Sequence, residues 1–383
     1  MSLNERRKTI NRREFLKRAA TLGITGLVQR LMGGVTLSAQ DAEVKRTPEP
    51  PVVRGGAAAD ELDHHIYLPL VSRQRPLAHG PSKLGLHTIY PNNTVPFVQA
   101  VADAGAHVAL VKALDYLDTP YWVKQASPET VTVARWSGRD AVDPSGDPAE
   151  KAAEMMRGKD DFKGHMYYWE NNRDGVDYWE ILNENNPATI AGHVWLARFF
   201  IETMNIAEDN GYKLALFSYN VGAPRWRDWE AIVETGVFAR AKAGGHVLAL
   251  HEYNWPVADY RWGEPMEDQP PYEDRGVLAG RYRYLYRDFL IPRDEVIPLA
   301  ITEGGLDPVL GGPPQEGPWK ERYVEEMIWY DTKLREDDYV IGVALFTVGP
   351  TSSWQGYDYE ELLWPGNPYG ANFLDYIVSL KDA

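Results

Sequence analysis

Two glutamates in this sequence follow apolar runs that predict strands. Glu184 lies in the segment WEILNENNP, directly after Asn183, and Glu303 lies in PLAITEGGLD. Each is expected to present a carboxylate where its strand ends. One protonated and one ionised carboxyl group can together cleave an acetal, because the acid protonates the leaving oxygen and the carboxylate attacks the neighbouring carbon. The two segments therefore indicate an acid and a nucleophile acting on an acetal.

The elements that must position these glutamates alternate regularly along the chain. Helical patterns separate the apolar segments, at 94–105, 192–211, 226–245 and 319–337. Near-continuous apolar strands separated by helices indicate a parallel sheet that is covered on both sides. We expect eight strands, at 83–90, 107–115, 130–136, 176–184, 213–220, 246–254, 297–305 and 340–348.

Eight such units fit an α/β fold of the (β/α)8 TIM barrel type, with residues 83–383 forming the barrel. An open, doubly wound sheet is the structural alternative, but no GxGxxG or GxxxxGK follows any predicted strand. In the barrel, Glu184 ends the fourth strand and Glu303 the seventh, on nearly opposite walls. Carboxyl groups so placed can approach the roughly 5 to 5.5 Å that a retaining glycosidase requires, whereas inversion requires a wider gap that admits water.

With these elements in place, residues 83–383 resemble a large clan of retaining (β/α)8 glycosidases that includes cellulase, mannanase, β-xylosidase and arabinofuranosidase families. The resemblance rests on three short motifs at predicted strand ends, in the clan's order. They are Asn183-Glu184 with the nearby Pro187, His251-x-Tyr253, and Thr302-Glu303-Gly304.

The resemblance implies a role for each matching residue. Glu184 would be the general acid and base, and Glu303 the nucleophile. Asn183 would contact the sugar 2-hydroxyl, and Tyr253 would donate a hydrogen bond to Glu303. His251 would line the same wall.

Some positions depart from the clan's pattern. Its usual Asn-Glu-Pro is stretched here to Asn-Glu-Asn-Asn-Pro, which changes the turn after Glu184. The eighth strand commonly ends in a tryptophan, but this one contains Phe346, so Trp354 in the following loop is the candidate for the floor of the sugar site. Lys112 and Arg135 compete for the place of an arginine near the nucleophile, with a structural salt bridge as the alternative for each.

Further substrate-binding candidates are polar or aromatic residues that follow predicted strands, where barrel enzymes place their sites. They are His87, Trp136, Asn220 and Trp255. The other histidines show no HExxH spacing, so neither a metal nor another cofactor is expected. The chain also has no GxSxG, which argues against a serine hydrolase.

Composition limits the classes of partner that the protein is expected to bind. The formal net charge of -15 disfavours binding to nucleic acid or to anionic membranes. The 13 Trp and 22 Tyr suit both core filling and flat platforms for sugar rings. The absence of cysteine excludes disulfides and thiolate metal sites.

The first residues predict export. Residues 11–17, NRREFLK, resemble the twin-arginine signal, and a weakly apolar stretch follows at 19–28. We expect a signal segment over 1–39 and a tether with one short strand over 40–82, placing the protein in the periplasm, on the cell surface or outside the cell.

The expected function is a retaining glycoside hydrolase acting on an oligo- or polysaccharide. Two alternatives stay open. One is a barrel that binds carbohydrate without turnover, and the other is a barrel enzyme of other chemistry, such as a lyase or a metal hydrolase.

Overall fold

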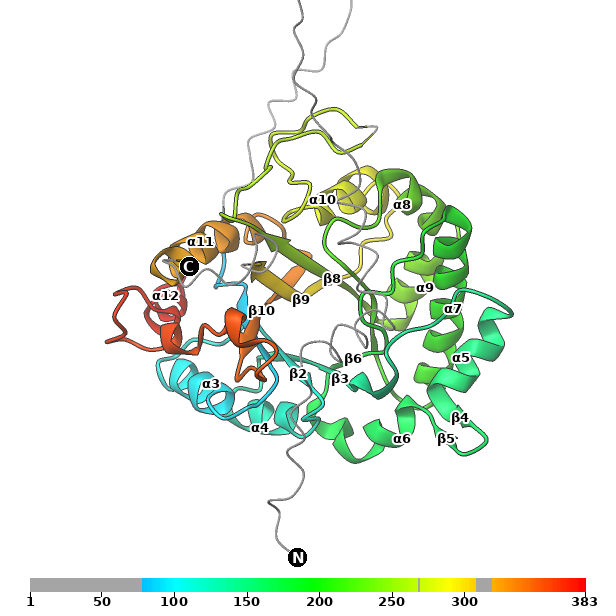
Figure 1. Cartoon of the computed structure of the whole chain (residues 1–383), viewed down its shortest axis with the longest axis horizontal. Coiled ribbons are helices and arrows are strands. Elements are labelled where there is room, and N and C mark those ends of the chain that lie inside the picture. The colour runs from blue at the N-terminus through cyan, green and yellow to red at the C-terminus, as the bar shows by residue number, and fades with distance from the viewer. Residues whose placement is uncertain (1–77, 268, 308–318) are drawn as a thin grey trace, which may run out of the picture. The chain divides into compact units, whose positions relative to one another are not determined.

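Eight parallel strands form a closed barrel in the computed structural model, which describes residues 78–267, 269–307 and 319–383 (Figure 1). Around the ring the order is β1-β10-β9-β8-β7-β6-β3-β2, so neighbours in sequence are neighbours in the barrel. The strands are β1 (Leu84–Thr88), β2 (Leu110–Leu114), β3 (Val131–Arg135), β6 (Tyr178–Glu180), β7 (Leu214–Tyr219), β8 (Val247–Asn254), β9 (Leu299–Leu306) and β10 (Val340–Val348).

Helices surround the barrel and cover the outward faces of its strands (Figure 1). They are α3 (Thr94–Asp103), α4 (Thr119–Ala126), α5 (Pro148–Arg157), α6 (His165–Trp169), α7 (Ile190–Asp209), α8 (Trp226–Val233), α9 (Val237–Gly244), α10 (Tyr282–Leu285), α11 (Trp319–Leu334) and α12 (Phe373–Ser379). Short 3-10 segments occupy Ser137–Arg139, Glu170–Gly175, Gln355–Tyr357 and Glu360–Leu363, a π turn spans Tyr286–Leu290, and β4 (Gly158–Lys159) pairs with β5 (Phe162–Lys163) as a small hairpin.

The predicted barrel is confirmed, with two differences in its elements. The helix expected over 226–245 is two helices, because Gly236 adopts a left-handed φ of 78° between α8 and α9. The fourth strand is shorter than expected, since β6 ends at Glu180 and Glu184 lies beyond it. The signal segment over 1–39 and the tether up to residue 77, including its expected strand, lie outside the described residues.

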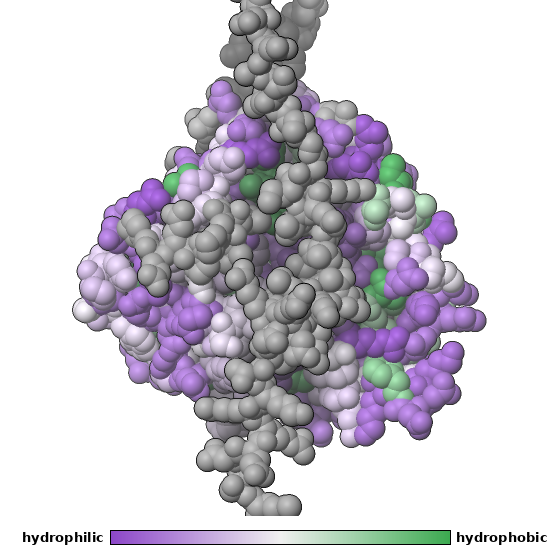
Figure 2. Space-filling view, viewed as in Figure 1, coloured by the Kyte–Doolittle hydropathy of each residue, from purple (hydrophilic) through white to green (hydrophobic). Residues whose placement is uncertain are grey.

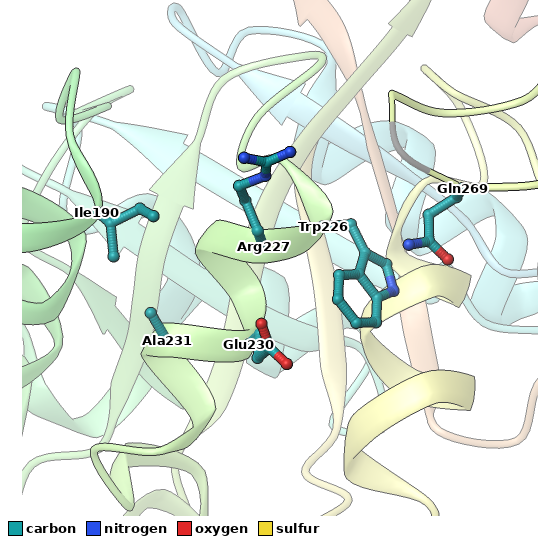
Figure 3. A pocket seen from close by; sticks show the side chains of 6 residues that line it. All are labelled: Ile190, Trp226, Arg227, Glu230, Ala231 and Gln269. Atoms are coloured by element: carbon teal, nitrogen blue, oxygen red, sulfur yellow. The ribbon is translucent and has the colours of Figure 1, made fainter.

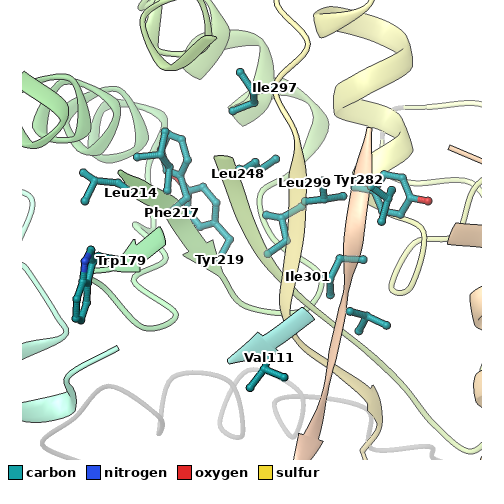
Figure 4. Packing of buried hydrophobic residues seen from close by; sticks show 14 of the residues in the cluster. Val111, Trp179, Leu214, Phe217, Tyr219, Leu248, Tyr282, Ile297, Leu299 and Ile301 are labelled. Carbon is teal, nitrogen blue, oxygen red and sulfur yellow. The ribbon is translucent and has the colours of Figure 1, made fainter. Parts of the chain in front are cut away.

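Large apolar side chains fill the layer between the strands and the helices. Figure 4 shows part of this layer, including Trp179, Leu214, Phe217, Leu248 and Ile301. Each is fully or almost fully buried, and burying one such side chain contributes about 1.5 to 3 kcal/mol. On the face seen in Figure 2, hydrophilic residues cover most of the described surface, and hydrophobic residues occur in small separate patches. In the described part of the chain, no helix has the length and apolar character needed to cross a membrane.

The barrel interior has an apolar layer with a charged layer next to it. The apolar layer includes Leu110, Val133, Ala215, Ala249, Ala300 and Ala344. Side chains along a strand alternate between its two faces. The residues two positions later therefore face inward as well, and they include Lys112, Arg135, His251 and Thr302. This alternation places the charged side chains at the carboxyl ends of the strands.

Candidate active site

Glu303 on β9 is surrounded by hydrogen-bond donors. Its Oε1 lies 3.0 Å from Lys112 Nζ, 3.5 Å from an Arg135 guanidinium nitrogen and 3.8 Å from His87 Nε2. The hydroxyl of Tyr253 donates a hydrogen bond to Oε2 over 3.1 Å. These donors come from four different strands, so the closed barrel is what assembles them.

A register shift between β8 and β9 directs Glu303 toward these donors. Leu250 pairs with Ile301 and His251 pairs with Glu303, so the pairing skips Thr302. Such an irregularity lets neighbouring residues both reach one side of the sheet. Thr302 donates a hydrogen bond to Glu180 inside the barrel, and Glu303 meets Lys112 there as well.

The surroundings of Glu303 keep it ionised. Burial by itself raises the pKa of a carboxyl group, but the positive charges of His251, Lys112 and Arg135 outweigh this effect and hold the pKa of Glu303 well below its ordinary value. Burial raises the pKa of Tyr253 well above 10, so its hydroxyl stays a neutral donor. Burial lowers the pKa of His87 to about 3, and this ring is therefore neutral. Glu303 is a buried carboxylate held in place by several donors.

Glu184 occupies a different environment, in the loop beyond β6. Its side chain is 37% exposed, against 10% for Glu303. Its backbone has a left-handed φ of 49°, which is uncommon for a residue with a side chain. A hydrogen bond from its backbone nitrogen to the carbonyl of Ser218 on β7 holds this conformation. The next residue, Asn185, is held in place because its side-chain oxygen accepts a hydrogen bond from the backbone nitrogen of Val142. The stretched loop thus turns the Glu184 carboxyl group toward the barrel mouth.

His251 lies between the carboxyl groups. Its Nδ1 is 3.1 Å from Glu184 Oε1 and 3.6 Å from Glu303 Oε2, and its Nε2 is 3.6 Å from Glu180 Oε1. Burial lowers the pKa of a histidine, but the nearby carboxyl groups of Glu303, Glu180 and Glu184 outweigh burial and raise the pKa of His251 to about 9. The ring is therefore an imidazolium at neutral pH, and both of its nitrogens are donors.

This protonation makes the stability of the fold depend on pH. The pKa of His251 is about 9 in the folded chain and 6.5 for an unperturbed histidine, so protonation favours the folded state. The contribution is complete below pH 6.5 and is lost as the pH rises through 9. We expect the thermal unfolding midpoint to fall over this range. A His251→Asn variant provides the control, and an equal slope in the variant and the wild type would contradict the assignment.

Glu180, the innermost carboxyl group of the cluster, was not among the residues predicted from the sequence. Glu180 ends β6 and is completely buried. Lys112 Nζ lies 2.7 Å from its Oε2, and Thr302 donates to its Oε1 over 3.1 Å. The sequence did contain a signal that could have identified Glu180, because a charged residue is unusual inside a strand that is predicted to be buried on both faces. Lys112 and Arg135, the two candidates for a cation near Glu303, both contact its carboxyl group.

The amide residues among the predicted site residues have free acceptors. Asn183 follows β6 by three positions and Asn220 follows β7 directly, and the side-chain oxygen of each is buried without a hydrogen-bond partner in the described structure. Buried polar atoms are normally paired. These two oxygens can accept hydrogen bonds from the hydroxyl groups of a ligand.

The predicted tryptophans differ in how they pack. Trp136 stacks on Tyr168 with ring centroids 3.8 Å apart, so protein covers one face of its indole. Trp255 is half-buried against the hydrophobic core. Trp354 is 37% exposed and packs edge-on against Phe346 at 5.4 Å. Phe346 in turn lies 6.3 Å from the ring of Tyr253, which connects Trp354 to the wall beside Glu303.

Three atoms that could act as metal ligands, one each from Glu184, His251 and Glu303, lie within 4.8 Å of one another. That spacing suits a metal ion, but the charges around it do not. Lys112 and Arg135 already place positive charge on Glu303, and His251 holds a proton that a metal would have to displace. The residues present therefore do not fit a divalent cation.

Because these residues do not fit a divalent cation, we expect the catalytic activity of the protein to be unchanged by chelators. The measurement is the turnover rate before and after dialysis against EDTA, with and without added Zn²⁺ or Mg²⁺. A loss on dialysis that either metal restores would instead support the metal hydrolase.

A separate hollow of about 500 Å³ lies between the start of α7, α8 and the loop that follows β8. Figure 3 shows Ile190 on one side of it and Gln269 on the other, with α8 between them. The lining residues are Ile190, Trp226, Arg227, Glu230, Ala231 and Gln269. The carboxyl groups of the cluster do not line this hollow.

No protein-family model matches the chain, and no curated protein matches it. Among solved structures, a β-porphyranase of glycoside hydrolase family 86 from Bacteroides plebeius is 16% identical, with 71% of this chain and 51% of that chain covered and a TM-score of 0.44. A family 39 glycoside hydrolase from Bacteroides cellulosilyticus is 13% identical, with 75% and 60% covered and a TM-score of 0.44. An endo-1,4-β-D-mannanase from Thermotoga petrophila is 11% identical, with 78% and 99% covered and a TM-score of 0.40.

This chain spans about half the length of the porphyranase and nearly all of the mannanase. Similarity at such identities concerns the fold, and a shared barrel does not by itself imply a shared activity. The assignment of the barrel rests on its own closed strand order. The chain is a (β/α)8 barrel, and the three solved structures compared with it are glycoside hydrolases.

Proposed function

We propose that the protein is a retaining glycoside hydrolase, with Glu303 as the nucleophile and Glu184 as the general acid and base. The observation that carries this proposal is the pair of carboxyl groups at the barrel mouth, which have oxygens within 4.8 Å of each other in unlike surroundings. Retaining enzymes separate the two groups by about 5 to 5.5 Å, and inverting enzymes by about 6.5 to 9.5 Å. A pair of oxygens this close is compatible with the separation that a retaining enzyme requires, and it supports attack by the Glu303 carboxylate.

In the first step, Glu184 transfers its proton to the glycosidic oxygen while a Glu303 oxygen attacks the anomeric carbon. The bond from that carbon to the leaving oxygen breaks, the alcohol departs, and the sugar is joined to Glu303 as an ester. Lys112, Arg135 and Tyr253 orient the attacking carboxylate through the contacts described above. Donors fixed before the reaction need no rearrangement at the moment of attack.

In the second step, Glu184 takes a proton from water, and the resulting hydroxide attacks the same carbon from the opposite side. Glu303 leaves as a carboxylate, and the hydroxyl group of the product has the configuration of the original bond. The negative charge that formation of the ester removed from Glu303 returns at this point, where His251 and Lys112 stabilise it. Two inversions give net retention.

The test is hydrolysis of a panel of aryl β-glycosides and polysaccharides, with the anomer first formed recorded by proton NMR. We expect hydrolysis of at least one substrate, with the product first appearing in the configuration of the substrate. A product of opposite configuration would assign an inverting mechanism and remove the nucleophilic role of Glu303.

The panel also separates the two alternative functions. If every substrate binds but none is cleaved, the protein is a carbohydrate-binding barrel. If cleavage gives an unsaturated sugar that absorbs in the ultraviolet, the reaction is an elimination and the protein is a lyase. Either result would overturn the proposed hydrolysis.

A further inference from the structure

A third carboxyl group lies beneath the two that the proposed hydrolysis uses. Glu180 has no exposed surface and forms contacts with three other strands. Its Oε2 lies 2.7 Å from Lys112 Nζ on β2. Its Oε1 accepts a hydrogen bond from Thr302 on β9 and lies 3.6 Å from His251 Nε2 on β8.

Lys112 connects this carboxylate to the nucleophile. Its ammonium lies 2.7 Å from Glu180 and 3.0 Å from Glu303, so it is shared between two carboxylates. A lysine side chain carries its charge at the end of a flexible four-carbon stem, so a single contact would not confine the ammonium group to one position. Glu180 supplies the second attachment, which fixes where the ammonium meets Glu303.

His251 connects Glu180 to both reacting groups. Its Nε2 faces Glu180, while its Nδ1 faces Glu184 and Glu303. A carboxylate that faces one ring nitrogen orients the ring and holds a proton on that nitrogen. Its charge also stabilises the imidazolium form, in which the other nitrogen carries a proton as well. The ring therefore presents a donor to the pair of glutamates as long as Glu180 is ionised.

We propose that Glu180 is a positioning residue for the proposed hydrolysis, which holds the Lys112 ammonium and the His251 ring in place against Glu303 and Glu184. This inference rests on the proposed function. Glu180 itself is too deeply buried to touch a substrate, so its effect must pass through these two side chains.

Charge, and not only shape, is central to this role. The cations Lys112, Arg135 and His251 face the carboxyl groups of Glu180, Glu303 and Asp140, and His251 also faces Glu184. Without Glu180, the Lys112 ammonium would form its ion pair with Glu303 alone. The Glu303 carboxylate would then be stabilised more strongly, which makes it a poorer nucleophile. Neutral His87 and the neutral Tyr253 hydroxyl complete the groups that face Glu303.

The test compares Glu180→Gln with Glu180→Asp in the full chain. The amide keeps the size of the side chain and removes its charge, and the aspartate keeps the charge but retracts it by one methylene. We expect Glu180→Gln to lower kcat by about 100-fold with little change in KM, as small displacements of reacting groups do. Glu180→Asp is expected to retain more activity than Glu180→Gln.

A second readout does not depend on turnover. NMR of histidine-labelled protein, with the His251 signal assigned from His251→Asn, follows the titration of this ring. In Glu180→Gln and, by a smaller amount, in Glu180→Asp, we expect the pKa of His251 to move below its wild-type value, since a facing carboxylate has been removed or withdrawn.

The matched control is Asp331→Asn. Asp331 is also a buried carboxyl group, but it lies on α11, where it accepts hydrogen bonds from the Lys83 backbone and the Tyr376 hydroxyl. This variant is expected to lower the thermal unfolding midpoint and to leave both the His251 titration and kcat close to wild type. It shows what the loss of a buried carboxylate does when its role is only structural.

The outcomes separate this inference from the proposed function. An unchanged His251 titration in Glu180→Gln overturns the positioning role, whatever the turnover. An active wild type with an unchanged kcat in Glu180→Gln overturns it as well. If the wild type cleaves no glycoside but the His251 titration shifts, the electrostatic connection through Glu180 stands and the proposed hydrolysis alone fails.

Discussion

Replacement of Glu303 by alanine is expected to lower kcat by on the order of 10⁵-fold, because it removes the attacking atom itself. Lys112 and Arg135 would keep their places, now without the carboxylate they face. The measurement is the hydrolysis rate of the best aryl glycoside from the substrate panel.

Azide sharpens this prediction. The small anion can occupy the space that the missing carboxylate leaves between those cations and attack the anomeric carbon directly. We expect azide to restore turnover in Glu303→Ala and to give a glycosyl azide of inverted configuration, since a single displacement inverts. Glu325→Ala, on the exposed surface of α11, serves as the control and is expected to behave as the wild type. Wild-type rates in Glu303→Ala would remove Glu303 from the mechanism.

Replacement of Glu184 by alanine is expected to have an effect that depends on the leaving group. General acid and base catalysis contributes about 10²- to 10⁴-fold. Substrates with poor leaving groups should lose activity by this factor, because the departing oxygen needs a proton. A dinitrophenyl glycoside needs no proton and should still form the ester with Glu303, which is observed as a burst of released phenol followed by slow turnover.

Azide gives the opposite stereochemical result in this second variant. It attacks the ester from the side where water normally enters, so two displacements occur and the glycosyl azide has the retained configuration. The pair of variants therefore assigns the two roles by product configuration. An inverted azide from Glu184→Ala, or equal losses for good and poor leaving groups, would contradict the assignment.

Sequence patterns alone were sufficient to predict the barrel. Local periodicity determines each strand and helix, and the alternation of apolar strands with helices leaves few topologies for a parallel sheet. All eight predicted strands are present. The helix expected over 226–245 was wrong in one respect, because a glycine at 236 turns the chain where helical periodicity on both sides suggested continuity.

The candidate site was only partly predictable. Glu184, Glu303, His251 and Tyr253 each follow or end an apolar run, so their placement at the barrel mouth followed from the strand assignments. Glu180 was not predicted, because the local sequence of the expected strand at 176–184 does not show that this charged side chain faces the barrel interior. Its contacts with other strands exist only after the barrel has closed.

The sequence by itself determined which residues are near the carboxyl end of each strand, because side-chain alternation and strand length are local properties of the chain. Tertiary structure alone decided which of them meet. Lys112 and Glu303 are 191 positions apart, and their contact exists only because the barrel closes. The unlike environments of Glu184 and Glu303 arise in the same way, since exposure and nearby charge are set by side chains from other strands and not by sequence neighbours.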